Sequence, residues 1–189
     1  SRSTAEYQEV LASNIEEYER LNRMAENLMF LARAEHGQRP LQLQVLDLGE
    51  VGDELCDYFE ALAEDRQLQL DNQLSGSLMA DQQLLQRALG NLLANAVRHA
   101  QPGSTVRLQR HDDAEFCWIG VHNPGPPIEA QHLGKLFDRF YRVDPSRAQP
   151  GDSGGLGLAI VHSIMQLHGG QVRVVSDTSG TLFELGFAQ

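Results

Sequence analysis

The chain has 189 residues, 41% of them hydrophobic, and a formal net charge of -11, which fits one compact domain with an appended element. The acidic balance argues against a nucleic-acid partner, because binding to a phosphate backbone depends on Lys and Arg neutralising the phosphates. A small nucleotide remains compatible, since it needs only a local cradle of amides and a few cations. The sequence has neither an apolar run of about 18 residues nor a signal-peptide pattern, so we expect a cytoplasmic piece of protein.

The first segment predicts one long helix. Residues 4–36 contain no Gly or Pro, and Gly37 followed by Pro40 is typical of a helix end. Spacings of four and three alternate along a heptad seam made of Tyr7, Leu11, Asn14, Tyr18, Leu21, Ala25, Leu28 and Ala32. So narrow an apolar stripe favours a partner helix, and the alternative is an amphipathic helix lying on its own domain.

The rest of the chain mixes strand-like and helical patterns. Alternation with a period of two predicts strands at 41–45, 68–70, 105–109 and 115–121 and in a final pair, and helical periodicity predicts helices at 48–66, at 81–100 and from a glycine-led start near 157. Strands in adjacent pairs predict an α+β fold with an antiparallel or mixed sheet, and not a doubly wound parallel one. Cys56 and Cys117, which form no Cys-x-x-Cys pair, are expected to be buried free thiols.

The helix predicted at 81–100, with Asp81 as its N-cap, has two contrasting faces. Its apolar face consists of Leu85, Leu89, Leu92, Leu93 and Ala96. The opposite face holds Asn91, Asn95, Arg98 and His99, at i, i+4, i+7 and i+8. Amide oxygens suit Mg²⁺ and the two basic groups suit phosphates, whereas the alternative is an ordinary solvated helix face.

Two glycine-containing turns add to this pattern. Residues 123–128 read Asn-Pro-Gly-Pro-Pro-Ile, in which the Asn123 amide is able to pair with an adenine edge and Gly125 permits close backbone approach. Residues 153–158 read Ser-Gly-Gly-Leu-Gly-Leu and open a helix, so their amides form a phosphate cradle. A dinucleotide fingerprint is rejected because a long polar loop, and no strand, precedes the glycines. Taken alone, the first turn is only a proline-rich loop.

The segment between these turns predicts a lid. Residues 142–154 contain Asp144, Pro145, Pro150 and Asp152 and have the length and composition of a mobile loop. Just before it, Phe137 and Phe140 are expected to anchor the base of the lid. Arg139 or Arg142 is expected to reach phosphates when the lid closes.

In this order, five elements resemble the N, G1, F, G2 and G3 boxes of bacterial two-component sensor histidine kinases. They are the asparagine face of 81–100, the turn at 123–128, Phe-Asp-Arg-Phe-Tyr-Arg at 137–142, Gly-Gly-Leu-Gly-Leu at 154–158 and Ser-Gly-Thr-Leu-Phe at 179–183. The resemblance is strong over 75–187, and the first helix looks like the second helix of the dimerisation and phosphotransfer hairpin. It implies two domains, 1–37 and 38–189. Residues 137–147 are similar to the heavy-metal subgroup that responds to copper or silver.

By resemblance, the fold is a Bergerat-type ATP-binding α/β sandwich and the cofactors are ATP and Mg²⁺. The resemblance implies roles for the site residues, which are Asn95 for Mg²⁺ with Asn91 in support, Arg98, His99, Arg139 and Arg142 for phosphates, Gly155, Leu156 and Gly157 for the phosphate cradle, and Asn123, Gly125 and Thr181 for adenine. The implied partners are a second copy, through the first helix, and the receiver domain of a response regulator. The full-length protein is expected in the bacterial inner membrane.

The sequence departs from the family pattern in two places. Asn123 stands where the family has Asp, which weakens adenine binding by about 1 kcal/mol because the charge-assisted bond is lost, and Pro127 replaces a second Gly. None of His36, His111, His122, His132, His162 and His168 has the His-Glu or His-Asp setting, with a Pro shortly after, of a phosphoacceptor. We therefore expect a trimmed fragment that binds ATP but has no phosphoacceptor and does not phosphorylate itself alone.

Three alternatives differ in class. Gyrase-type and chaperone ATPases of this fold place a Glu one turn before the metal-binding Asn, but here that residue is Asn91, which is not a general base. An anti-sigma-factor serine kinase is not expected to have the long heptad helix. A degenerate pseudokinase that only binds nucleotide and dimerises is the non-enzymatic alternative.

Overall fold

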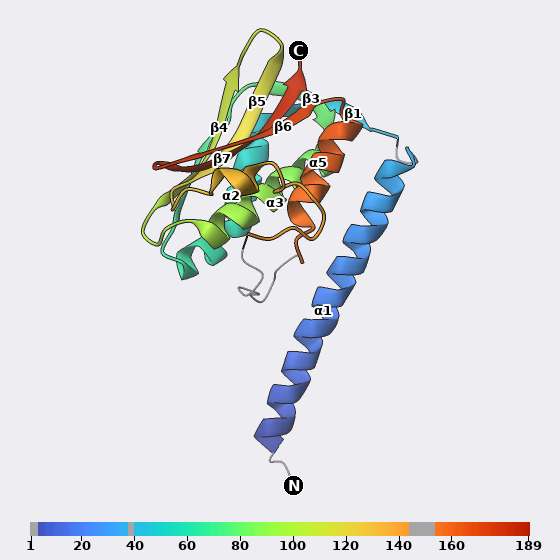
Figure 1. Cartoon of the computed structure of the whole chain (residues 1–189), viewed down its shortest axis with the longest axis vertical. Helices are drawn as coiled ribbons and strands as arrows, with labels where there is room; N and C mark the ends of the chain where they lie inside the picture. The colour runs from blue at the N-terminus through green and yellow to red at the C-terminus, as the bar shows by residue number, and fades with distance from the viewer. Residues whose placement is uncertain (1–3, 38–39, 144–153) are drawn as a thin grey trace.

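The computed structural model describes residues 4–37, 40–143 and 154–189, with side chains from residue 7 onward. Its elements follow one another as α1, β1, α2, β2, β3, α3, β4, β5, α4, α5, β6 and β7 (Figure 1). The helices are α1 (Thr4–Glu35), α2 (Leu48–Asp65), α3 (Gln82–His99), α4 (Ala130–Leu133) and α5 (Gly157–Leu167). The strands are β1 (Leu43–Asp47), β2 (Gln69–Gln73), β3 (Ser77–Asp81), β4 (Thr105–Asp112), β5 (Phe116–Asn123), β6 (Gln171–Asp177) and β7 (Gly180–Ala188).

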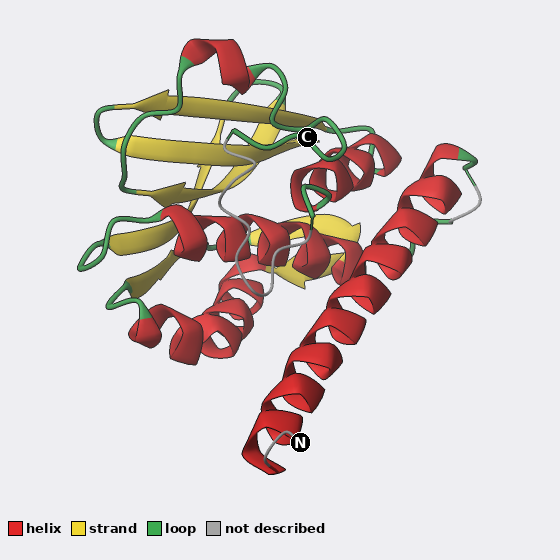
Figure 2. Cartoon of the chain, turned by 60° about the horizontal axis from the view of Figure 1, so that its bottom comes forward, coloured by secondary structure: helices red, strands yellow, loops and turns green. Residues whose placement is uncertain are grey.

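A five-stranded sheet in the order β2-β4-β5-β7-β6 forms one layer of the domain. Only β2 and β4 run parallel, and the other neighbours are antiparallel, so the predicted mixed sheet is confirmed. Helices α2, α3 and α5 form the second layer (Figures 1 and 2). The core lies between the layers, where Ile119 and Val121 of β5 are fully buried against leucines of α3.

Helix α3 begins as the sequence predicts. The Asp81 carboxylate accepts a hydrogen bond from the Leu84 amide at 3.1 Å, which satisfies one of the free donors of the first turn. An equivalent cap that the sequence analysis did not recognise starts α2, where Asp47 accepts from the amides of Gly49 and Glu50. Both capping residues end a strand of the small antiparallel β1–β3 sheet, so this sheet sets where the two helices start.

Strand β3 and the one-turn helix α4 were not predicted. β3 has five residues, Ser77–Asp81, and it exists through pairing with β1, in which Leu46 lies opposite Leu78. Such a short pattern does not distinguish a strand from a turn unless its partner is known. Helix α4 has only four residues and no side-chain cap.

Helix α1 presents two different faces. The predicted seam is exposed, with Leu11 at 60%, Tyr18 at 73% and Leu21 at 51%. A second stripe that includes Met24 and Leu31 packs on the domain, mainly against α5 (Figure 1). The sequence analysis treated the partner helix and the domain as alternatives, but this helix uses one face for the domain and leaves the seam uncovered.

Within the described residues, no helix is long and apolar enough to cross a membrane. The two cysteines are free thiols. Cys117 is buried as predicted, and burial raises the pKa of its thiol to about 11. Cys56 is only half-buried, so its predicted burial is wrong, because it follows the buried Leu55 by about 100 degrees around α2 and lies at the edge of the buried stripe.

Replacement of a side chain on the docking face of α1 should destabilise the chain. Leu31 is fully buried, so Leu31→Ala is expected to lower the free energy of unfolding by about 2–4 kcal/mol in urea melts followed by circular dichroism. Met29 on the same helix is 56% exposed and lies outside the seam, so Met29→Ala should cost less than about 0.5 kcal/mol. Equal losses for the two variants would mean that α1 is not docked.

Candidate nucleotide site

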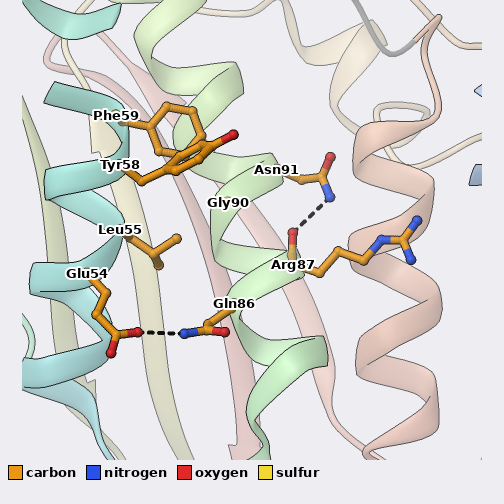
Figure 3. A pocket seen from close by; sticks show the side chains of 8 residues that line it. All are labelled: Glu54, Leu55, Tyr58, Phe59, Gln86, Arg87, Gly90 and Asn91. Atoms are coloured by element: carbon orange, nitrogen blue, oxygen red, sulfur yellow. Dashed lines mark hydrogen bonds between the residues drawn. The ribbon is translucent and has the colours of Figure 1, made fainter. Parts of the chain in front are cut away.

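Helix α3 turns its polar face out because its apolar face is fully occupied. Leu89 and Leu93 are 0% exposed, whereas Asn91 and Asn95 are half-buried on the other side. The Asn91 amide nitrogen donates to the Arg87 carbonyl at 2.8 Å, so its oxygen is the atom directed away from the helix (Figure 3). The helix therefore presents an oriented amide oxygen one turn before Asn95, as a cation site requires.

The predicted adenine residues lie side by side on two strands. Asn123 and Thr181 are direct partners in the β5–β7 pairing, and each is 4% exposed. The Thr181 hydroxyl lies 2.8 Å from the Ser176 hydroxyl, which also accepts a hydrogen bond from the Ile128 amide at 2.9 Å. Ser176 thus joins the end of the 123–128 turn to Thr181. Sequence reasoning missed it, although its place opposite Thr181 follows from a hairpin between the last two strands.

The 123–128 turn packs against the end of α3. The Gln101 amide donates to the Pro124 carbonyl at 2.9 Å, and a Cβ added to Gly125 would lie 3.2 Å from the His99 carbonyl oxygen. Gly180, at φ +134, is tighter still, since its Cβ would lie 2.2 Å from the Asn123 carbonyl oxygen. Backbone contact at these glycines thus brings three predicted motifs together.

The start of α5 is the predicted phosphate cradle. Leu156 is fully buried at the N-cap position, and its apolar side chain accepts no hydrogen bond from the first turn of the helix. This turn offers amide donors and a positive dipole end to an anion. Just before it, Gly155 at φ +79 accepts a hydrogen bond from the Phe140 amide at 3.0 Å. Helices α3 and α5 pack together, which places this turn in the same layer as Asn95.

The two aromatics before the predicted lid behave differently. Phe137 is half-buried and makes an edge contact with Phe183, with ring centroids 6.1 Å apart, so it packs on the sheet, while its role at the base of the lid stays a prediction. Phe140 is 55% exposed with φ +62, and its predicted role as a side-chain anchor is wrong. Its left-handed backbone conformation turns the ring outward while its amide bonds to Gly155.

The contacts with phosphate that were predicted for Arg139 and Arg142 stay predictions. Arg139 forms an ion pair with Glu35 at the end of α1, and Arg142 is half-buried. Most of the expected lid, residues 144–153, lies outside the described residues. Arg139 must therefore exchange Glu35 for a phosphate if it is to contact nucleotide.

The donor set fits Mg²⁺ bound together with phosphates better than a complete metal cage. Asn91 and Asn95 supply neutral oxygens, and Mg²⁺ usually completes its shell with water and substrate phosphates. In the part of the chain that the structure describes, no group of three or more His, Cys, Asp or Glu is arranged to hold a metal ion.

A mixed sheet covered by helices, with an asparagine-bearing helix and glycine turns at one end, defines a nucleotide-binding α+β sandwich. The family model of histidine kinase-, DNA gyrase B- and HSP90-like ATPases matches residues 80–188. The chain belongs to this family and carries its ATP-binding domain.

The most informative relatives are sensor kinases. The chain is 44% identical over 188 residues to the sensor histidine kinase CusS of Escherichia coli (strain K12), covering 97% of this chain and 38% of that protein. It is 43% identical to the sensor protein CzcS of Cupriavidus metallidurans, covering 98% of this chain and 39% of that protein. It thus spans about two fifths of the length of these curated relatives.

Solved structures share the fold. The histidine kinase AdeS of Acinetobacter baumannii matches with a TM-score of 0.78 at 21% identity, covering 100% of this chain and 86% of that chain. Full-length ShkA in complex with AMPPNP matches with a TM-score of 0.82 at 20% identity, covering 98% of this chain and 39% of that chain. Both matches extend over nearly the whole chain, so the arrangement of the long helix and the sandwich also occurs in these kinases.

The close approach of Gly155 to Phe140 gives a stability test. A Cβ at Gly155 would lie 2.9 Å from the Phe140 backbone at a positive φ, so Gly155→Ala should cost about 2 kcal/mol in denaturant melts. Gly134 ends α4 with a helical backbone and nothing within 4 Å of its Cβ position, so Gly134→Ala should be nearly neutral. A neutral Gly155→Ala would show that the turn before α5 is not built as described.

Proposed function

We propose that this chain is the catalytic ATP-binding part of a sensor histidine kinase that takes part in metal-ion sensing. In this proposal residues 1–37 are the second helix of the dimerisation hairpin, and residues 38–189 are the catalytic domain. The single observation that carries it is the packing of the 123–128 turn against the end of α3, with Asn123 paired to Thr181, within the matched family domain. The relatives CusS and CzcS, both sensor proteins by name, support the kinase class.

Each group of site residues has a distinct task. Asn123 and Thr181, direct partners in the β5–β7 pairing, hold adenine near the end of α3, and Gly125 lets the turn approach the α3 backbone closely. The amides of the turn 155–157 bind the phosphates at the start of α5, and Arg98 and His99 in the last turn of α3 contact the same phosphates. Asn95, supported by Asn91, holds Mg²⁺, which neutralises phosphate charge when it is bound.

The proposed reaction moves the γ-phosphoryl group from ATP to an imidazole nitrogen. The bond between the β–γ bridging oxygen and the γ-phosphorus breaks, a phosphorus–nitrogen bond forms, and ADP leaves. The acceptor histidine is not one of the seven in this chain, and it passes the phosphoryl group on to an aspartate of a response regulator. The residues of the site act by positioning and charge neutralisation, because little covalent work falls to the protein in phosphoryl transfer.

The seam of α1 suits a second copy of the chain. Tyr7, Leu11, Tyr18 and Leu21 are each more than half exposed and repeat at heptad spacing on a helix that is docked through its other face. Burial of this stripe against the same stripe of a partner helix would give the homodimer. Location of the full-length protein in the bacterial inner membrane belongs to the same proposal.

Magnesium-dependent ATP binding is the first test. Titration of Mg²⁺·ATP by calorimetry should give binding that weakens at least about tenfold in Asn95→Ala and also when magnesium is chelated. Asn22 lies on α1 and donates a hydrogen bond to Glu26 of the same helix, so Asn22→Ala should bind Mg²⁺·ATP as the parent does. Absence of ATP binding to the parent chain would contradict the kinase proposal and would leave a module that only dimerises.

The neutral residue at the adenine position gives a second test. Asn123→Asp should tighten Mg²⁺·ATP binding by about 1 kcal/mol, roughly fivefold, because an ionised carboxylate accepts the adenine amino group more strongly than an amide does. Guanine has a carbonyl in place of that amino group, so Mg²⁺·GTP binding should not tighten. An equal gain in affinity for both nucleotides would show that residue 123 does not contact the adenine amino group.

A further inference from the structure

A groove of about 440 Å³ lies between α2 and α3 and has an apolar floor. Leu55 and Phe59 of α2 form the floor and are 8% and 9% exposed (Figure 3). Tyr58 stands above them at 81% exposure, with its ring 5.2 Å from that of Phe59 in an edge contact. Leu62, one turn farther along α2, is 48% exposed, so apolar surface continues out of the groove.

The groove is open because α3 places no side chain into its middle. A Cβ added to Gly90 would meet only Leu55, at 3.9 Å. The neighbouring Arg87 turns its guanidinium away to α1, where it lies 4.2 Å from the Phe30 ring centroid and donates to Asn27 at 2.9 Å. Gly90 therefore leaves space for a side chain that this chain itself does not supply.

The exposed surface of helix α2 is strongly acidic. The helix has neither Lys nor Arg, and its exposed carboxylates are those of Glu50, Asp53, Glu54, Asp57, Glu60, Glu64 and Asp65. At 100 degrees per residue Glu54, which lines the groove, and Asp65 lie within about 40 degrees of Tyr58, whereas the other carboxylates lie farther round the helix from the groove. Burial, followed by the charges of Asp53, Asp57 and Asp71, raises the pKa of the Cys56 thiol to about 11, as expected next to such a negative surface.

Charge decides which kind of partner fits. The whole chain has a formal net charge of -11, so a second copy or an anionic membrane surface would meet this helix with like charge. A cationic segment is attracted to it, and such complementarity raises the rate of encounter and excludes wrong partners. The apolar floor then needs one buried anchor side chain, in the way that aromatic anchors fill pockets at protein interfaces.

We propose that this groove is the docking site for a basic segment of a partner protein. Its aromatic or aliphatic anchor fills the space between Tyr58 and Gly90, and its Lys and Arg side chains pair with Glu54 and Asp65 at the rim. The groove ends at Asn91, so the segment binds beside the helix that carries the proposed Mg²⁺ ligand. This docking does not depend on ATP binding or phosphoryl transfer.

The probe is a fluorescein-labelled peptide of about 15 residues with alternating Lys and Arg turns and one central Trp, compared with the same peptide with Ser in place of Trp. Fluorescence anisotropy should show binding that weakens at least about tenfold with the Ser peptide and in Gly90→Leu, which fills the groove without changing charge. Tyr58→Ser should act in the same direction. Thermal melts show whether each variant is folded. If Gly90→Leu does not fold, Tyr58→Ser still tests the proposal, because Tyr58 is an exposed site.

A charge-matched pair of variants separates docking from general attraction. Glu54→Gln with Asp65→Asn on α2, the two carboxylates nearest Tyr58, should weaken binding of the peptide at least about threefold at low salt, whereas Glu9→Gln with Glu16→Gln on the exposed face of α1 should change it little. Equal weakening by both pairs, together with unchanged binding to Gly90→Leu and Tyr58→Ser, would overturn the proposal in favour of attraction by net charge. Self-association that Tyr58→Ser abolishes in sedimentation would also overturn it, because the occupant would then be a second copy.

Discussion

Helix α3 is clamped between the sheet and α5, and its fully buried leucines, such as Leu85 and Leu89, fix its rotation. A helix held in this way has only a narrow strip left to face outward, and Asn91 and Asn95 occupy it. The end of the same helix supports the 123–128 turn through the His99 carbonyl contact at Gly125. Close packing makes this arrangement rigid, because rotation of α3 would open voids in the core while it moved the amides. The geometry of the nucleotide site therefore follows from the burial of apolar side chains that never contact nucleotide.

The antiparallel pairing of β5 with β7 supplies the other half of the site. It sets Asn123 beside Thr181, although 58 positions separate them in the sequence, and the short β6–β7 hairpin adds Ser176 to the same cluster.

Helix α1 lies between this domain and the partner helix proposed for its seam. Its last turn touches the segment before the predicted lid through the pair of Glu35 with Arg139, so a change in the docking of α1 and a change in that segment are physically linked.

Local patterns were sufficient for much of this architecture. The periodicity of α3, its Asp81 cap and the glycine-led start of α5 are each properties of one short stretch, and all are confirmed. Features that depend on distant partners were not predictable. Strand β3 exists through its pairing with β1. The stripe of α1 that faces the domain, with Leu31, lies in the same stretch as the heptad pattern, and that pattern alone was enough to predict the helix. The Phe140 ring points outward because the Phe140 amide bonds to the Gly155 carbonyl, and no local sequence pattern predicts this contact. The site residues were named from motif order, and what the fold adds is the contacts that hold several of them together.

The central claim is that this chain catalyses phosphoryl transfer to a histidine on another polypeptide. The most direct measurement mixes the chain and γ-labelled Mg²⁺·ATP with a separate polypeptide that carries the histidine-bearing helix of the hairpin, and follows the label. The account predicts label on that histidine and none on the chain itself, with transfer lost in Asn95→Ala. Label that is released as inorganic phosphate at the same rate with and without the acceptor would indicate an ATPase. Label that stays on bound ATP would indicate a nucleotide-binding module, and either result would contradict the account.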